Sequence, residues 1–216
     1  MTTVAKAGAA GSASNAAQRT SRRTVTISDV YFSVDIETDG PIPGPYSLLS
    51  FALVPAGSMR EGRFVRPPRG EDSLYFELQP ISEQFEPEAL AINGLDRDRL
   101  KREGLPPTVA MERARDWIAE RAPQGVPVLV AYPLSFDWSW LYWYFVRFTG
   151  GSPFNHSRCF DLKTAVAVKA KRPIAKSGHK HLPEPLRSSL PHTHNALDDA
   201  LAQAEVFANL MEWDGT

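Results

Sequence analysis

Two acidic side chains stand two positions apart in a stretch that otherwise favours a buried strand. Residues 31–40 read YFSVDIETDG. Because successive side chains of a strand point to opposite faces, Asp35 and Glu37 are predicted to share one face, opposite an apolar one. Neighbouring carboxylates repel each other, and burying them unpaired is unfavourable. A bound divalent cation would remove that cost, so this pair is predicted to be half of a magnesium site.

The other candidate ligands stand near the predicted starts of two helices. Asp137 follows a short apolar stretch, VPVLVA at 126–131, and Asp198 and Asp199 begin the last helix. His194 lies five residues before Asp199. A two-metal phosphodiesterase site needs several carboxylates, a water and a base, with its ions about 3.5–4 Å apart. These residues, added to Asp35 and Glu37, are therefore the candidates for the rest of such a site.

Each of these residues also has a simpler explanation. An acid near a helix start is favoured by the helix dipole alone, by about 0.3–1 kcal/mol. Two His-x-His pairs, His179/His181 and His192/His194, are compatible with a zinc site and hence with a zinc hydrolase. A flexible, proline-rich basic loop in which histidines occur by chance is the better explanation of these pairs.

Composition narrows the class of protein. The chain has 216 residues, 43% hydrophobic and 23% charged, and a net charge of -1. These values fit one globular domain and argue against a protein that coats nucleic acid by bulk charge. Cys159 is the only cysteine, which excludes an intrachain disulfide and favours a reducing, cytoplasmic compartment. No apolar run approaches the ~20 residues of a membrane span, so no membrane partner is expected.

The hydrophobic pattern predicts an α/β fold with a five-stranded mixed sheet flanked by helices. Residues 1–28 carry basic but no acidic residues and are predicted to be a disordered basic tail, with the folded domain at 29–216. The expected strands are 30–37, 46–54, 73–78, 126–131 and 157–162. The expected helices are 87–92, 108–121, 137–148, 163–171 and 195–213. Residues 57–70 are predicted to be a turn-rich connection, and 171–193 a flexible basic loop.

The predicted helix 137–148, DWSWLYWYFVRF, is aromatic around its whole circumference. Such a helix is buried or meets a partner. Core packing or a subunit interface is the favoured interpretation, and stacking of nucleic-acid bases is the other.

The combination of motifs resembles the DEDDh 3′–5′ exonucleases, the family of proofreading subunits, RNase T and oligoribonuclease. Its first motif matches VDIETDG at 34–40, its second SFDWSWL at 135–141 and its third HNALDDA at 194–200. The stretch PEALAINGL at 87–95 resembles the segment before the family's first long helix. The motifs stand in family order, and the resemblance covers roughly residues 30–211.

The resemblance implies an RNase H-like fold and stepwise 3′–5′ hydrolysis of single-stranded DNA or RNA to nucleoside 5′-monophosphates. Asp35, Glu37, Asp137 and Asp199 would bind two Mg²⁺ or Mn²⁺ ions, with His194 as the general base. A histidine pKa near ~6.5 suits that role. Asp199 is preferred over Asp198 because of its spacing from His194. By analogy, Thr38 would bind the terminal nucleotide.

The sequence leaves other possibilities open. A homodimer fits both the aromatic helix and the family. An RNase H-like module that binds nucleic acid without cleaving it is an alternative function, as is a structural protein that uses its aromatic helix to bind a partner.

Overall fold

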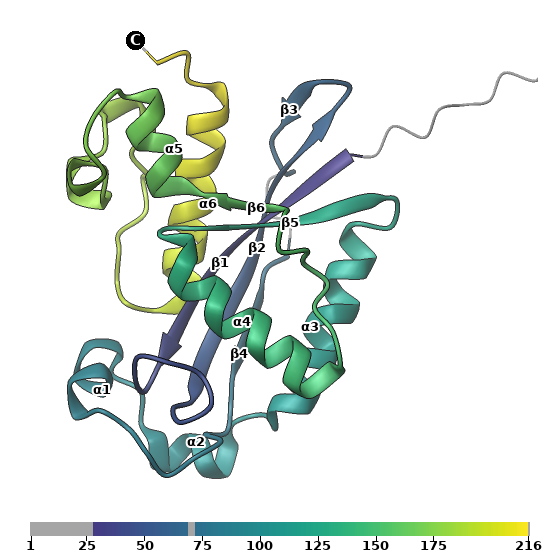
Figure 1. Ribbon diagram of the computed structural model, residues 1–216, viewed down its shortest axis with the longest axis vertical. Helices are drawn as coiled ribbons and strands as arrows, with labels where there is room; N and C mark the ends of the chain where they lie inside the picture. Colours follow the sequence, from purple (N-terminus) through teal and green to yellow (C-terminus); the bar gives the residue numbers. More distant parts are fainter. Residues whose placement is uncertain (1–27, 69–71, 216) are drawn as a thin grey trace, which may run out of the picture.

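The computed structural model describes residues 28–68 and 72–215, which form a central mixed sheet with helices around it (Figure 1). The predicted basic tail, apart from Ser28, lies outside the described residues. The strands are β1 Ser28–Thr38, β2 Leu48–Arg60, β3 Arg63–Val65, β4 Leu74–Glu77, β5 Gly125–Ala131 and β6 Cys159–Asp161. Their order is β3-β2-β1-β5-β6, and β4 also pairs with β2. β1 is therefore central, antiparallel to β2 and parallel to β5.

The sheet has six strands, one more than the sequence predicted. The additional strand, β3, arises because β2 continues to Arg60 and turns back through Glu61 and Gly62, so that Met59 pairs with Phe64. Both turn residues have positive φ, 49° and 76°, as a two-residue hairpin turn requires. Flanking arginines and prolines hide this short hairpin in a sequence pattern that favours a loop.

The helices are α1 Pro87–Asn93, α2 Arg97–Glu103, α3 Pro107–Arg121, α4 Leu134–Thr149, α5 Leu162–Lys169 and α6 Ala196–Glu212. Three short 3-10 turns, at 174–176, 179–181 and 184–186, lie between α5 and α6. The prediction of an α/β fold with a mixed sheet flanked by helices is confirmed, while α2 was not expected. Among helices of the described ranges, none is long and apolar enough to cross a membrane.

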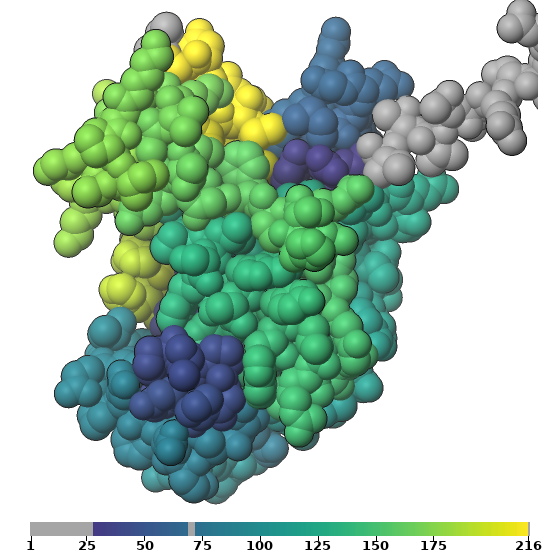
Figure 2. Space-filling view, viewed as in Figure 1, coloured from purple at the N-terminus to yellow at the C-terminus, as the bar shows by residue number. Residues whose placement is uncertain are grey.

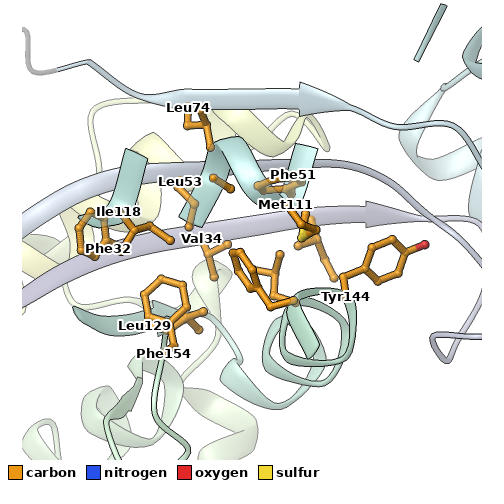
Figure 3. Packing of buried hydrophobic residues seen from close by; sticks show 14 of the residues in the cluster. Phe32, Val34, Phe51, Leu53, Leu74, Met111, Ile118, Leu129, Tyr144 and Phe154 are labelled. Carbon is orange, nitrogen blue, oxygen red and sulfur yellow. The ribbon is translucent and has the colours of Figure 1, made fainter. Parts of the chain in front are cut away.

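One face of the sheet packs against α3 and α4 (Figures 1 and 3). Phe32 and Val34 of β1 lie there with Leu129 of β5, Ile118 of α3 and Tyr144 of α4, all in one buried cluster. The aromatic helix α4 therefore contributes mainly to the core. Its other side remains exposed at Phe136, Tyr142 and Val146.

The opposite face of β1 is covered by α6, whose Phe207 contacts Tyr31 with ring centroids 4.8 Å apart. β5 pairs with β1 only as far as Ser33, opposite Val130, and the chain then leaves the sheet to begin α4. Asp35 and Glu37 consequently lie beyond the last β5 pairing. This open end of β1 is where α4 and α6 begin, and it is where the candidate site residues gather.

Candidate active site

Three of the predicted carboxylates meet at the open end of β1. Oxygen atoms of Asp35, Glu37 and Asp199 lie within 4.8 Å of one another. Asp35 and Glu37 are partly buried, and Asp199 is 2% exposed. Burial, followed by the charges of Asp137, Glu37 and Asp199, raises the pKa of Asp35 well above its usual range. Burial and the charge of Asp199 raise the pKa of Glu37 to about 8. Such a cluster of oxygen ligands fits Mg²⁺ or Mn²⁺, which would offset the repulsion.

Asp137 lies beside this group, in the first turn of α4. It is 6% exposed, and its charge raises the pKa of Asp35. Burial, with the charge of Glu37, raises the pKa of Asp137 itself. Asp137 is not among the three residues whose oxygens approach within 4.8 Å. Among the neighbouring charges, that of Asp137 has the largest effect on Asp35, so Asp137 belongs electrostatically to the carboxylate group although it comes from α4.

Asp199 is fixed by the segment that leads into α6. Its carboxylate accepts hydrogen bonds from the backbone N–H of Thr193 at 2.9 Å and of His194 at 3.0 Å. Nδ1 of His192 lies 2.8 Å from its Oδ1. The neighbouring Asp198 is exposed and accepts a bond from the Thr193 hydroxyl. One step of about 100° along a helix separates the two acids, so only Asp199 faces the carboxylates.

His194 stands beside Asp199, on the solvent side of the site. Its side chain is exposed, and a ring nitrogen lies within 4.8 Å of the ligand atoms of Asp199 and His192. The backbone of His194 has φ 58°, a left-handed conformation that is unfavourable for most side chains. The N–H bond to Asp199 holds it there. The imidazole is thus placed next to the carboxylates and open to water.

The comparison with curated proteins yields a relative that covers most of the chain. The 3′–5′ DNA exonuclease Cap18 of Escherichia coli is 33% identical over 183 residues, 84% of this chain and 91% of that protein. The chain belongs to this family of 3′–5′ exonucleases. No family model matches it.

Solved structures show that the fold of this exonuclease is RNase H-like. The nuclease domain of 3′hExo, a DEDDh family member bound to rAMP, superposes with a TM-score of 0.60 at 13% identity, over 84% of this chain and 90% of that one. The zinc-bound complex of E. coli exonuclease I with single-stranded DNA gives a TM-score of 0.58 at 15% identity. That match covers 84% of this chain, which spans 40% of the length of exonuclease I.

Gln203 is a residue of the candidate site that the motifs did not indicate. It lies one turn after Asp199 on α6 and is 2% exposed, and its Nε2 donates to Oδ1 of Asp35 at 2.7 Å. This bond lowers the pKa of Asp35, opposing the larger effect of burial. Its Oε1 is buried without a hydrogen-bond partner among the described residues. The signal in the sequence was an amide in the apolar stripe of α6, four residues after Asp199.

The two His-x-His pairs have different surroundings. His179 stacks on His192, with ring centroids 5.2 Å apart and planes at 10°, and also contacts Tyr132 at 4.1 Å. Burial, and secondarily His192, lower the pKa of His179 to about 4. His192 in turn contacts His194 at 4.6 Å. His181 does not belong to either group of potential metal ligands in the described ranges. The repeated spacing therefore marked a real histidine cluster, built from His179 and the second pair.

Thr38 lies at the end of β1, at the rim of a cavity of about 350 Å³ that Glu37 also lines. The Thr38 side chain is buried and its hydroxyl donates to the carbonyl of Gly40. A Cβ on Gly40 would lie 2.1 Å from the ring of Tyr46, which explains the glycine of the first motif. Asn93 of α1 donates to the Thr38 carbonyl at 3.0 Å. These contacts fix the turn that forms one wall of the cavity.

Proposed function

We propose that the chain hydrolyses single-stranded nucleic acid from the 3′ end and releases nucleoside 5′-monophosphates. The observation that carries this proposal is the convergence of Asp35, Glu37 and Asp199, with Asp137 close by, at the open end of β1. We propose DNA as the substrate, because the Escherichia coli relative Cap18, 33% identical to this chain, is named as a DNA exonuclease.

Asp35, Glu37, Asp137 and Asp199 would hold two Mg²⁺ or Mn²⁺ ions. When bound, such ions activate water and stabilise charge on the attacking and leaving oxygens. The chain contributes a fixed set of oxygens, since Asp35 is positioned by Gln203 and Asp199 by two backbone N–H groups. Burial, together with repulsion between the acids, raises the pKa of Asp35 and Glu37, and a bound cation would relieve both effects.

His194 would remove a proton from the attacking water. Its exposed imidazole lies close enough to Asp199 to reach a water held there, and neutral imidazole is a suitable base near pH 7. The left-handed turn at His194 directs the histidine and its backbone N–H to the same carboxylate. In this proposal, Asp199 helps to hold the attacking water and His194 accepts its proton.

The cavity beside Thr38 would receive the terminal nucleotide. It is lined by Ile92, 62% exposed, and Phe136, 39% exposed, along with Glu37 and Asn93. Exposed apolar side chains that face a cavity suit the planar surface of a base. Phe136 directly precedes Asp137, so a base that contacts Phe136 would place its phosphate near the carboxylates.

The segment between α5 and α6 would contact the phosphates of the strand. It forms a lobe above the layer of α1 and α2 in the view of Figure 2, and Lys171, Lys176 and Lys180 are exposed on it. It lacks long helices and strands, as predicted, but it is anchored by buried Leu182 and Leu186 and by the Tyr132 hydroxyl, which donates to the Ser177 carbonyl. Neutralising these lysines should weaken the salt dependence of DNA binding, because fewer counterions are released.

The test uses 5′-labelled single-stranded DNA, the same strand in a duplex, and RNA of the same sequence. In Mg²⁺ we expect successive products one nucleotide shorter from the 3′ end, with single-stranded DNA cleaved fastest. Free 5′-monophosphates should appear from the first cycle, and a chelator should stop the reaction. Internal cleavage, or undiminished activity in the chelator, would contradict the proposal.

A further inference from the structure

A second cluster of potential metal ligands shares Asp199 with the carboxylate group. Ligand atoms of His192, His194 and Asp199 lie within 4.8 Å of one another, and the pair His192 Nδ1 and Asp199 Oδ1 is 2.8 Å apart. Both histidines are exposed, so a metal ion from solution can reach them. This cluster contains two imidazoles, whereas Asp35, Glu37 and Asp199 offer oxygen alone.

The donor atoms decide which metals each group prefers. Carboxylates suit Mg²⁺ and Mn²⁺, whereas two imidazoles with one carboxylate suit Zn²⁺ and Co²⁺. Tetrahedral zinc with bonds of about 2.0–2.1 Å places its ligand atoms roughly 3.4 Å apart. The spacings here, 2.8 Å for one pair and up to 4.8 Å for the others, bracket that value. Small rotations of two exposed imidazoles are therefore sufficient.

The two histidines are held in place by contacts other than those to a metal. The ring of His192 stacks on His179, which contacts Tyr132 at the end of β5. The backbone of His194 is held by its N–H bond to Asp199. These contacts already limit the motion of the two histidines. Ordering them around a bound ion therefore costs less conformational entropy, which favours binding.

We propose that His192, His194 and Asp199 form an inhibitory site for Zn²⁺ or a similar transition-metal ion. An ion bound there occupies Asp199, which the Mg²⁺-dependent reaction needs, and the His194 imidazole, which would otherwise accept a proton. Zinc and magnesium therefore compete for one carboxylate. The inhibition rests on the proposed function, whereas the binding of zinc does not.

Binding is tested on the full chain after metal removal, with Co²⁺ as a visible-light probe and Zn²⁺ to displace it. We expect absorption bands of Co²⁺ bound by nitrogen, lost on addition of Zn²⁺. His192→Asn should lower the affinity for both ions by at least about tenfold, since even the partners of metal ligands contribute about 10–100-fold. His156→Asn, a histidine outside the cluster, should not change it.

Inhibition is tested by adding Zn²⁺ to the Mg²⁺-dependent reaction. The rate with zinc is expressed as a fraction of the rate of the same variant without zinc. We expect inhibition of the unaltered protein at zinc concentrations far below that of magnesium, and at least about tenfold more zinc for the same effect in His192→Asn. The rate without zinc reports on the exonuclease reaction separately.

Equal zinc sensitivity in His192→Asn would overturn the proposal, because the ion would then act at Asp35 and Glu37. Unchanged Co²⁺ spectra in that variant would overturn it too. Should the variant fail to fold, anomalous scattering at the zinc edge from crystals of the unaltered protein gives the answer. Density between His192, His194 and Asp199 supports the site, and density confined to Asp35 and Glu37 refutes it.

Discussion

β1 and the segment between α5 and α6 both bring side chains to the site, but they are held in different ways. Asp35 lies in a strand that pairs with β2 along its length, opposite Ala52. The segment before α6 is held mainly by side chains, including Glu205, which accepts bonds from Ser188 and Ser189. A ligand on the sheet is fixed by the backbone of its neighbours, whereas a ligand on the segment depends on a few separate contacts.

The two regions also differ in charge. β1 contributes two carboxylates whose pKa values are raised by burial and by neighbouring acids. The segment contributes histidines and exposed lysines. In the proposed reaction, the carboxylates would bind metal ions, and the segment would contact the phosphates and accept the proton of the attacking water. We therefore expect the variants below to separate metal binding from later steps.

Asp35→Ala should abolish hydrolysis in Mg²⁺ or Mn²⁺, because it removes the carboxylate that interacts with all three of the other acids. The measurement is release of nucleotides from a 5′-labelled single strand. Asp29→Ala, at the other end of β1, is the matched control and should keep full activity. Full activity of Asp35→Ala would show that Asp35 on β1 is not a required metal ligand.

Asp199→Ala and Asp198→Ala form a matched pair on α6. Asp199 lies with the carboxylates and Asp198 is exposed, so only the first change should reduce turnover, by more than about 10²-fold given what even indirect contacts to metals contribute. Asp199→Ala should also free the Thr193 and His194 backbone groups that bind it. Equal losses in the two variants would show that the ligand assignment is wrong.

His194→Ala should lower turnover by about 10²–10⁴-fold, the usual contribution of a general base. Binding of DNA and of Mn²⁺ should change little, because the carboxylates remain. Single-turnover rates and binding of DNA in Ca²⁺ separate these effects. Near-normal turnover would show that His194 is not the general base. Loss of Mn²⁺ binding would show that His194 is instead a metal ligand.

Gln203→Met should raise the Mg²⁺ concentration needed for half-maximal rate by about 10-fold, as for other residues that position a metal ligand. The shape of the side chain is nearly kept, but the bond to Asp35 is lost. Ser33→Ala removes another buried polar group on the same face of β1 and should leave the magnesium requirement unchanged. If both variants need the same Mg²⁺ concentration for half-maximal rate, Gln203 does not position the metal ligand.

Without metal, the unfolding free energy should fall as pH rises from 6.5 to 8. The pKa of Glu37 is about 8 in the folded chain, above its ordinary value, so the folded state binds more protons in this range and loses stability as they dissociate. His179, whose lowered pKa acts in the opposite direction, contributes only below about 6.5. Denaturation experiments in a chelator should show this fall of the unfolding free energy with pH. The fall should be smaller when Mg²⁺ is added, and smaller in the variant Glu37→Gln. An unchanged fall in Glu37→Gln would assign it to another group.

Much of the fold and of the candidate site follows from local sequence. Period-two alternation indicated β1 and the side of it that carries Asp35 and Glu37, and helical periodicity indicated α3 and α6. These features could be predicted because each depends on neighbours within one element. The choice of Asp199 over Asp198 came instead from the resemblance to the exonuclease family, whose third motif spaces a histidine and an aspartate five residues apart.

Other features depend on contacts between distant residues. The pairing that creates β3, the bond from Gln203 to Asp35 across 168 positions, and the stacking of His179 on His192 have no local signal. The sequence by itself determined the types of candidate site residue and the elements that carry them. Only the tertiary structure decided that Asp137 of α4 comes close enough to raise the pKa of Asp35 and that Asp199 belongs to two groups of ligands. The reason is that these relations are set by where β5 leaves the sheet and where the segment before α6 crosses the end of β1.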